Sequence, residues 1–166
     1  MDHNLNYTTI GELIRKKREE KEVGLSELGR ISGVPKSTIS KIETGEIKSP
    51  RMKYIKPIAD VLGMPYEEVI ECYIELEHRN AILNDFLTEV AEFSNLSLIE
   101  KVAMKFLENS KKSTNELLQN LIEIAGTFES SEVRLTIYNT MIKYARLHGE
   151  SQYVAKGRLK KDLLKK

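Results

Sequence analysis

The chain has 166 residues, of which 40% are hydrophobic and 31% charged, a balance typical of a folded protein with an apolar core. Its single cysteine, Cys72, excludes an intrachain disulfide, and we see neither a signal peptide nor a membrane-spanning run, so we expect a cytoplasmic protein. Charge is uneven: Lys and Arg number twelve against nine Asp and Glu in residues 1–66, six against fourteen in 67–135, and eight against two in 136–166.

The first part of the chain predicts five short helices. Thr9 and Glu12 form a capping box, which begins a helix that runs to about residue 21. Apolar residues at helical spacing predict further helices over 26–32, 35–43, 51–62 and 65–76, with Gly33 and Gly63 at the turns. Leu25, just before the helix over 26–32, and Leu28 and Ile31 within it are expected to share one apolar face. Together the five helices predict a domain over residues 1–77.

Residues 78–166 predict a second, all-helical domain. Helical stretches recur over 80–93, 97–109, 114–126, 131–147 and 151–165, separated by short polar breaks. Alternate helices begin roughly 34 residues apart, which is the period of tetratricopeptide (TPR) hairpins. We therefore expect an all-α protein whose second domain is a short antiparallel, TPR-like array of helical hairpins that serves interaction or dimerisation.

The segment from Leu25 to Gly45 carries the clearest functional pattern. Its two short helices are joined by a turn that contains Gly33, and the second helix carries small polar and basic side chains. Two helices joined in this way form a helix-turn-helix, a unit that places its second helix in the major groove of DNA. The pattern therefore predicts a protein that binds double-stranded DNA.

Residues 10–70 closely resemble the Cro/repressor-type (XRE) helix-turn-helix family. The resemblance rests on the apolar, turn and helix-ending positions Leu28, Gly33-Val34, Ile39-Ser40, Glu43 and Gly45, and on the segment 59–63. Two positions depart from the family pattern. Leu25 stands where the family often has a glutamine that contacts the DNA backbone, and Gly29 stands where alanine is usual.

This resemblance implies three sets of functional residues. Those expected to read base edges are Lys36, Ser37, Thr38 and Lys41, although helix capping by Ser37 and Thr38 and simple exposure of the lysines are the alternatives. Those expected to contact phosphates are Ser26, at a helix N-terminus, and Lys48 and Arg51. Arg18 and Glu43 are expected to form a structural ion pair.

The remainder of the chain more weakly resembles the helical-repeat region of peptide-responsive bacterial regulators, the Rap, NprR and PlcR group. That resemblance implies dimerisation and a short signalling peptide as ligand. Two half-sites on DNA also favour a homodimer. Apolar residues of the last two helices either form its interface or fill the core: Ile137, Met141, Leu147, Leu159 and Leu163.

Little in the sequence indicates catalysis. His3, His78 and His148 have no partners at metal-ligand spacing, and there is no glycine-rich phosphate loop, so we expect neither an enzyme nor a bound metal or cofactor. Three hypotheses remain open. The chain is a sequence-specific regulator, most simply a dimeric repressor, or a peptide-sensing receptor-regulator, or an interaction protein that titrates a partner regulator without binding DNA.

Overall fold

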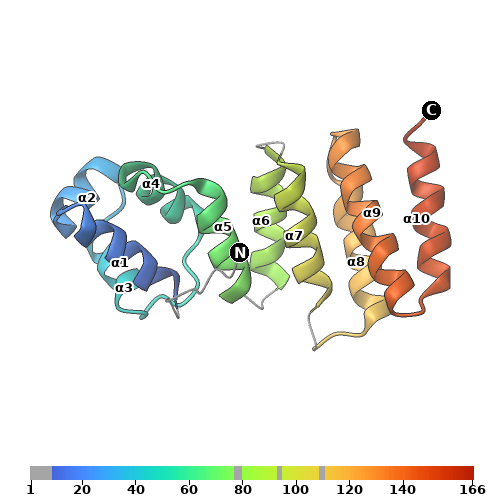
Figure 1. Ribbon diagram of the computed structural model, residues 1–166, viewed down its shortest axis with the longest axis horizontal. Coiled ribbons are helices and arrows are strands. Elements are labelled where there is room, and N and C mark those ends of the chain that lie inside the picture. Colours follow the sequence, from blue (N-terminus) through green and yellow to red (C-terminus); the bar gives the residue numbers. More distant parts are fainter. Residues whose placement is uncertain (1–8, 77–79, 93–94, 109–110) are drawn as a thin grey trace. The chain divides into compact units, whose positions relative to one another are not determined.

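The computed structural model describes residues 9–76, 80–92, 95–108 and 111–166. These residues form ten α-helices, and no strand occurs among them, which confirms the predicted all-α fold (Figure 1). The chain divides into two compact units, residues 1–77 and residues 78–166. No helix in the described ranges is long and apolar enough to cross a membrane.

The N-terminal unit contains five helices, and their bounds lie within a few residues of the predicted ones. They are α1 (Ile10–Glu20), α2 (Leu25–Ser32), α3 (Lys36–Glu43), α4 (Met52–Leu62) and α5 (Tyr66–Leu76). Thr9 caps α1 as expected, because its hydroxyl oxygen accepts a hydrogen bond from the Glu12 N–H at 3.1 Å. Helix α1 contacts α3, α4 and α5, and α2 contacts α3 and α4.

The core of this unit forms where the apolar faces of these helices meet. Its fully buried side chains include Leu28, Ile39, Ile42, Ile55, Ile58 and Leu62. Ile31, which the sequence places on the apolar face of α2, is 49% exposed. Leu28 of the same helix is fully buried, whereas Ile31, in the last turn, stays about half exposed.

The turn between α2 and α3 depends on a glycine. Gly33 has a φ of 74°, in the left-handed region, and its N–H bonds to the Gly29 carbonyl at 3.0 Å to end α2. Pro35 then occupies the N-cap of α3 rather than its first turn. Two short helices joined by such a connection form a helix-turn-helix.

A second glycine allows α1 to lie very close to the end of α3. A β-carbon built on Gly11 would lie 1.9 Å from the Ile42 carbonyl oxygen and 3.2 Å from the Glu43 Cα. Both neighbours are backbone atoms, so rotation of a side chain cannot relieve such a clash. Glycine at this position therefore determines how closely α1 and α3 approach.

The C-terminal unit is a series of antiparallel helices (Figure 1). They are α6 (Asn80–Glu92), α7 (Leu96–Leu107), α8 (Thr114–Gly126), α9 (Ser131–Leu147) and α10 (Ser151–Leu163). Helix α9 contacts α7, α8 and α10, and α6 contacts α7. The antiparallel order of these helices agrees with the expected helical hairpins. That the hairpins form a TPR-like array stays a prediction.

The apolar residues considered for a dimer interface fall into two groups. Ile137 and Met141 are fully buried within the unit, so for these two the interface alternative is wrong. Leu147, Leu159 and Leu163 are 73%, 61% and 54% exposed. Helix α10 therefore presents two leucines, Leu159 and Leu163, to solvent.

Candidate nucleic-acid interface

The outer face of α3 carries two of the residues predicted to read bases. Ile39 and Ile42 hold the inner face of the helix in the core. Ser37 and Lys41, four residues apart and thus one above the other, are exposed on the opposite side. Lys36 is exposed at the first helical position, and Thr38 is half-buried on the flank. Neither Ser37 nor Thr38 caps the helix, because Pro35 holds the N-cap position.

The residues predicted to contact phosphates lie on exposed segments around the helix-turn-helix. Helix α2 begins one residue earlier than predicted, at Leu25, which puts Ser26 in its first turn. The N–H groups of a first turn have no partner within their helix and are therefore suited to hold a phosphate. Lys48 is exposed in the loop after α3, and exposed Arg51 is the N-cap of α4, where its side chain makes no capping bond.

Hydrogen bonds at both ends fix the loop that carries Lys48. At its start, the Ile47 N–H donates to the Lys41 carbonyl at 2.9 Å, and the Gly45 N–H donates to the Ile42 carbonyl at 3.1 Å. At its end, the Tyr73 hydroxyl of α5 donates to the carbonyl of buried Pro50 at 2.5 Å. These hydrogen bonds hold the backbone of the loop that follows α3 and carries Lys48.

One acidic residue on this surface was missed by the sequence analysis. The Glu46 carboxylate lies 3.4 Å from the Lys41 ammonium, and both side chains are more than half exposed. Glu46 follows the end of α3, where the partial negative charge of a helix disfavours an acid. Only the fold-back of residues 44–47 onto the Lys41 carbonyl brings the two together, and sequence spacing gives no sign of this turn.

Replacing Glu46 with Gln is expected to strengthen binding to duplex DNA of any sequence by several-fold. The exchange removes a negative charge that repels phosphate and frees Lys41 from a competing exposed pair, which is worth on the order of 0.2–1 kcal/mol. Fluorescence anisotropy with a random-sequence duplex measures the change. Glu129→Gln, at an exposed position of the C-terminal unit, is the matched control with the same change in charge. An equal gain in both variants would show only an effect of net charge.

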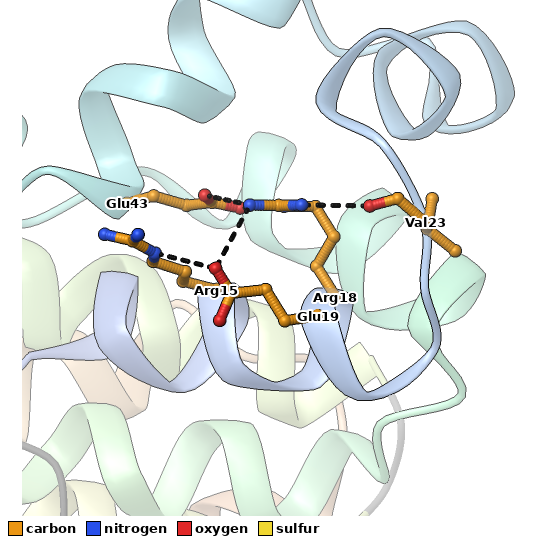
Figure 2. A network of polar contacts seen from close by, with 5 residues as sticks. All are labelled: Arg15, Arg18, Glu19, Val23 and Glu43. Atoms are coloured by element: carbon orange, nitrogen blue, oxygen red, sulfur yellow. Dashed lines mark hydrogen bonds and ion pairs between the residues drawn. The ribbon is translucent and has the colours of Figure 1, made fainter.

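Arg18 and Glu43 form a two-pronged ion pair between α1 and α3 (Figure 2). Arg18 Nε lies 2.7 Å from Glu43 Oε1 and Nη2 lies 2.9 Å from Oε2, while Nη1 donates to the Val23 carbonyl at 2.9 Å. The side chains are only 13% and 5% exposed. The hydrogen bond to Glu43 raises the pKa of Arg18, so the guanidinium stays charged over the working pH range. The pair therefore links the end of the exposed helix to the scaffold.

The structure explains why glycine stands at position 29, where the Cro/repressor-type family usually has alanine. A β-carbon here would lie 3.0 Å from the Val34 carbonyl oxygen and 3.3 Å from the Lys36 nitrogen. The glycine thus lets α2 press against the first residue of α3. Leu25, the other departure, is half-buried at the first position of α2.

The residues considered for metal or catalytic chemistry are not among those predicted to contact DNA. In the described ranges, no three His, Cys, Asp or Glu side chains gather as metal ligands. The His148 ring stacks on Tyr144 with 3.8 Å between ring centroids, and burial raises the pKa of the Cys72 thiol. His3 and His78 lie outside the described residues.

Comparison with known proteins places this geometry in a family. The model of the family described as "Helix-turn-helix" matches residues 14–69. The HTH-type transcriptional repressor RghR of Bacillus subtilis (strain 168) is 31% identical over 109 residues, which cover 60% of this chain and 79% of RghR. The chain belongs to the helix-turn-helix family of transcriptional regulators. This confirms the predicted family.

Two further relatives support the assignment of this regulator. The HTH-type transcriptional regulator SinR of Bacillus subtilis is 26% identical over 102 residues, which cover 61% of this chain and 92% of SinR. The HTH-type regulator RghRB of the same organism is 37% identical over 61 residues, which cover 37% of this chain and 44% of RghRB. No solved structure matches the regulator. As a member of this family, the regulator binds double-stranded DNA.

Proposed function

We propose that this regulator binds specific DNA sites as a homodimer, with α3 in the major groove, and represses transcription from them. The observation that carries the proposal is the outer face of α3, where Ser37 and Lys41 stand exposed between basic Lys36 and the loop of Lys48. Lysine donates to the O6 and N7 atoms of guanine, and serine donates to or accepts from either strand.

Contacts with the phosphates of the DNA backbone would supply most of the affinity for DNA. From Lys36 to Lys56 the chain carries six Lys or Arg against two Glu, and Lys48 and Arg51 are exposed in this stretch. Contacts of this kind orient a protein on the duplex without reading sequence, and they weaken steeply as salt rises. The proposed division is thus base reading by α3 and phosphate contact by Ser26, Lys48 and Arg51.

Dimerisation and repression are supported by less direct observations. One such domain covers few base pairs, so two half-sites and a two-fold dimer are the economical arrangement. Leu159 and Leu163, one turn apart and exposed on α10, offer an apolar surface for a second copy. The relative RghR is named a transcriptional repressor, which favours repression. The proposal places the regulator in the cytoplasm and gives it no catalytic step.

Selection of bound duplexes from a random pool tests the proposed function directly. We expect an enriched motif with two related half-sites about one helical turn apart, which is the spacing of a two-fold dimer. A single half-site would contradict the dimer. No enrichment, together with no salt-dependent gel shift on any duplex, would instead favour the interaction protein that titrates a partner. The peptide-receptor alternative stays a prediction that calorimetry against short peptides tests.

Replacing Lys41 with Ala is expected to reduce discrimination at particular base pairs by about 1–3 kcal/mol, because a base-reading donor is lost. The measurement compares the affinity for the selected site with affinities for single-base variants of it. Equal losses on all sequences would show that Lys41 contacts only phosphate.

Arg51→Ala is the matched variant for that measurement. It also removes one exposed positive charge, but from the N-cap of α4 rather than from α3. We expect weaker binding to every duplex alike and a salt dependence whose slope is lower by about one. An unchanged slope would remove Arg51 from the phosphate contacts.

A further inference from the structure

The C-terminal unit contains a groove between α9 and α10 whose walls carry positive charge. Its volume is about 350 Å³, and it is partly open to solvent. Four cationic side chains line it, Lys143 and Arg146 from α9 and Arg158 and Lys161 from α10, together with apolar Ile142 and Leu147 and the amide of Asn139. No acidic side chain occurs among these lining residues.

Helix ends do not account for this gathering of charge. Arg146 and Lys161 lie in the last turns of their helices, where positive charge is favourable, but Lys143 and Arg158 lie further inside. Lys143 contacts Glu100 of α7 at 3.6 Å. Within the described residues, no ion pair is formed by Arg146, Arg158 or Lys161. Three of the four cations thus converge without a counter-charge, and such like charges repel one another and concentrate a positive potential in the groove.

The walls of the groove are held firmly in place. Gly157 of α10 is buried against α9, and a β-carbon built on it would lie 2.5 Å from Ile142 Cγ1 and 2.7 Å from Met141 Cε. At the start of the same helix, the Tyr153 hydroxyl donates to the Asn115 carbonyl of α8 at 3.1 Å. The groove is therefore a built feature of α9 and α10, which lie side by side at the end of the unit (Figure 1).

We propose that this groove binds an acidic polypeptide segment of a partner protein, one that carries glutamate or aspartate beside an apolar side chain. The positive walls would pair with the carboxylates, and Ile142 and the exposed Leu147 would cover the apolar side chain. Small-molecule ligands are usually enclosed on most of their surface, which an open groove does not provide. A polypeptide that lies across the groove needs no such enclosure.

Two other occupants fit the groove less well. Nucleic acid would satisfy the cations with phosphate but would leave Leu147, which is 73% exposed, without an apolar contact. A second copy related by a two-fold axis would set the same four cations against each other, which is repulsive. The proposal rests on the C-terminal unit alone and holds whether or not the specificity proposed for α3 is correct.

The test uses the full chain and a synthetic peptide in which leucine recurs at helical spacing among glutamates. We expect saturable binding by calorimetry and loss of at least about tenfold in affinity, about 1.4 kcal/mol, for the variant Arg158→Glu/Lys161→Glu. The matched control is Lys160→Glu/Lys166→Glu, which makes the same charge change on exposed positions of the same segment outside the groove. A second peptide, with serine in place of leucine, is expected to bind about tenfold more weakly.

Four outcomes would overturn the proposal. They are no binding of the glutamate–leucine peptide, equal losses in both charge variants, equal binding of the serine peptide, and a groove variant that loses affinity for duplex DNA rather than for the peptide. Circular dichroism of each variant first establishes that it is folded. The experiment measures affinity for a peptide. A negative result would therefore contradict the groove proposal without bearing on the selection experiment, which tests binding to DNA.

Discussion

Replacing Glu43 with Ala is expected to lower the free energy of unfolding of the N-terminal unit by about 3–5 kcal/mol. The substitution leaves the guanidinium of Arg18, which is 13% exposed, without the carboxylate that accepts two of its hydrogen bonds. A buried charge that loses its partner costs far more than the intact pair contributes. Urea unfolding measures the loss, and hydrogen exchange at the amides of α1 and α3 locates it in this unit.

Two further variants separate this mechanism from a general loss of charge. Glu19→Ala removes an exposed acid that also faces Arg18, at 3.9 Å, and it should cost less than about 1 kcal/mol. The double variant Arg18→Met/Glu43→Leu, which places apolar groups at both positions, should be more stable than Glu43→Ala. A double variant as unstable as the single one would show that the unpaired charge of Arg18 is not the cause of the loss.

Gly11→Ala is expected to destabilise the same unit by about 3 kcal/mol, at the upper end of what overpacking usually costs. The new β-carbon would meet the Ile42 carbonyl oxygen at 1.9 Å, so α1 must move away from the end of α3. This movement also stretches the contact between Arg18 and Glu43, which joins the same two helices. Thermal unfolding of the full chain measures the effect, and loss of DNA binding should accompany it.

Gly126→Ala provides the matched control for this substitution. Gly126 is the last residue of α8, and a β-carbon built on it would have no neighbour within 4 Å. Alanine there should leave stability unchanged or raise it by about 0.4–1 kcal/mol, because it restricts the unfolded chain. Equal destabilisation by both exchanges would mean that the close approach at Gly11 is not the cause.

Much of the fold was predictable because it depends on local patterns. The apolar spacing of Ile10, Leu13 and Ile14, the cap at Thr9 and the turn glycines each act within one or two helical turns, and the helices begin and end near the predicted residues. The family was predictable for the same reason, since the spacing of two helices and a turn is contained in a short stretch of sequence. The roles of the individual DNA-contact residues stay predictions.

The features that were missed depend on contacts between distant segments. Nothing around Gly11 reveals that the Ile42 carbonyl lies against it, and nothing around Glu46 reveals that it meets Lys41. Ile31 follows the apolar pattern of its own helix, yet its side chain stays about half exposed. The groove likewise requires α9 and α10 to be packed before its four cations converge. Periodicity predicts which face of a helix is apolar, but only packing decides which part of that face is covered.

The hydrogen bond from Tyr73 to Pro50 connects the last helix of the N-terminal unit to the loop that carries Lys48. Tyr73 is buried in α5, and its hydroxyl holds the Pro50 carbonyl, one residue before Arg51. A displacement of α5 must either carry this carbonyl along or break the bond, and in both cases the loop that holds Lys48 changes position. The position of the loop that carries Lys48, and with it the phosphate contact proposed for this residue, therefore depends on the position of α5.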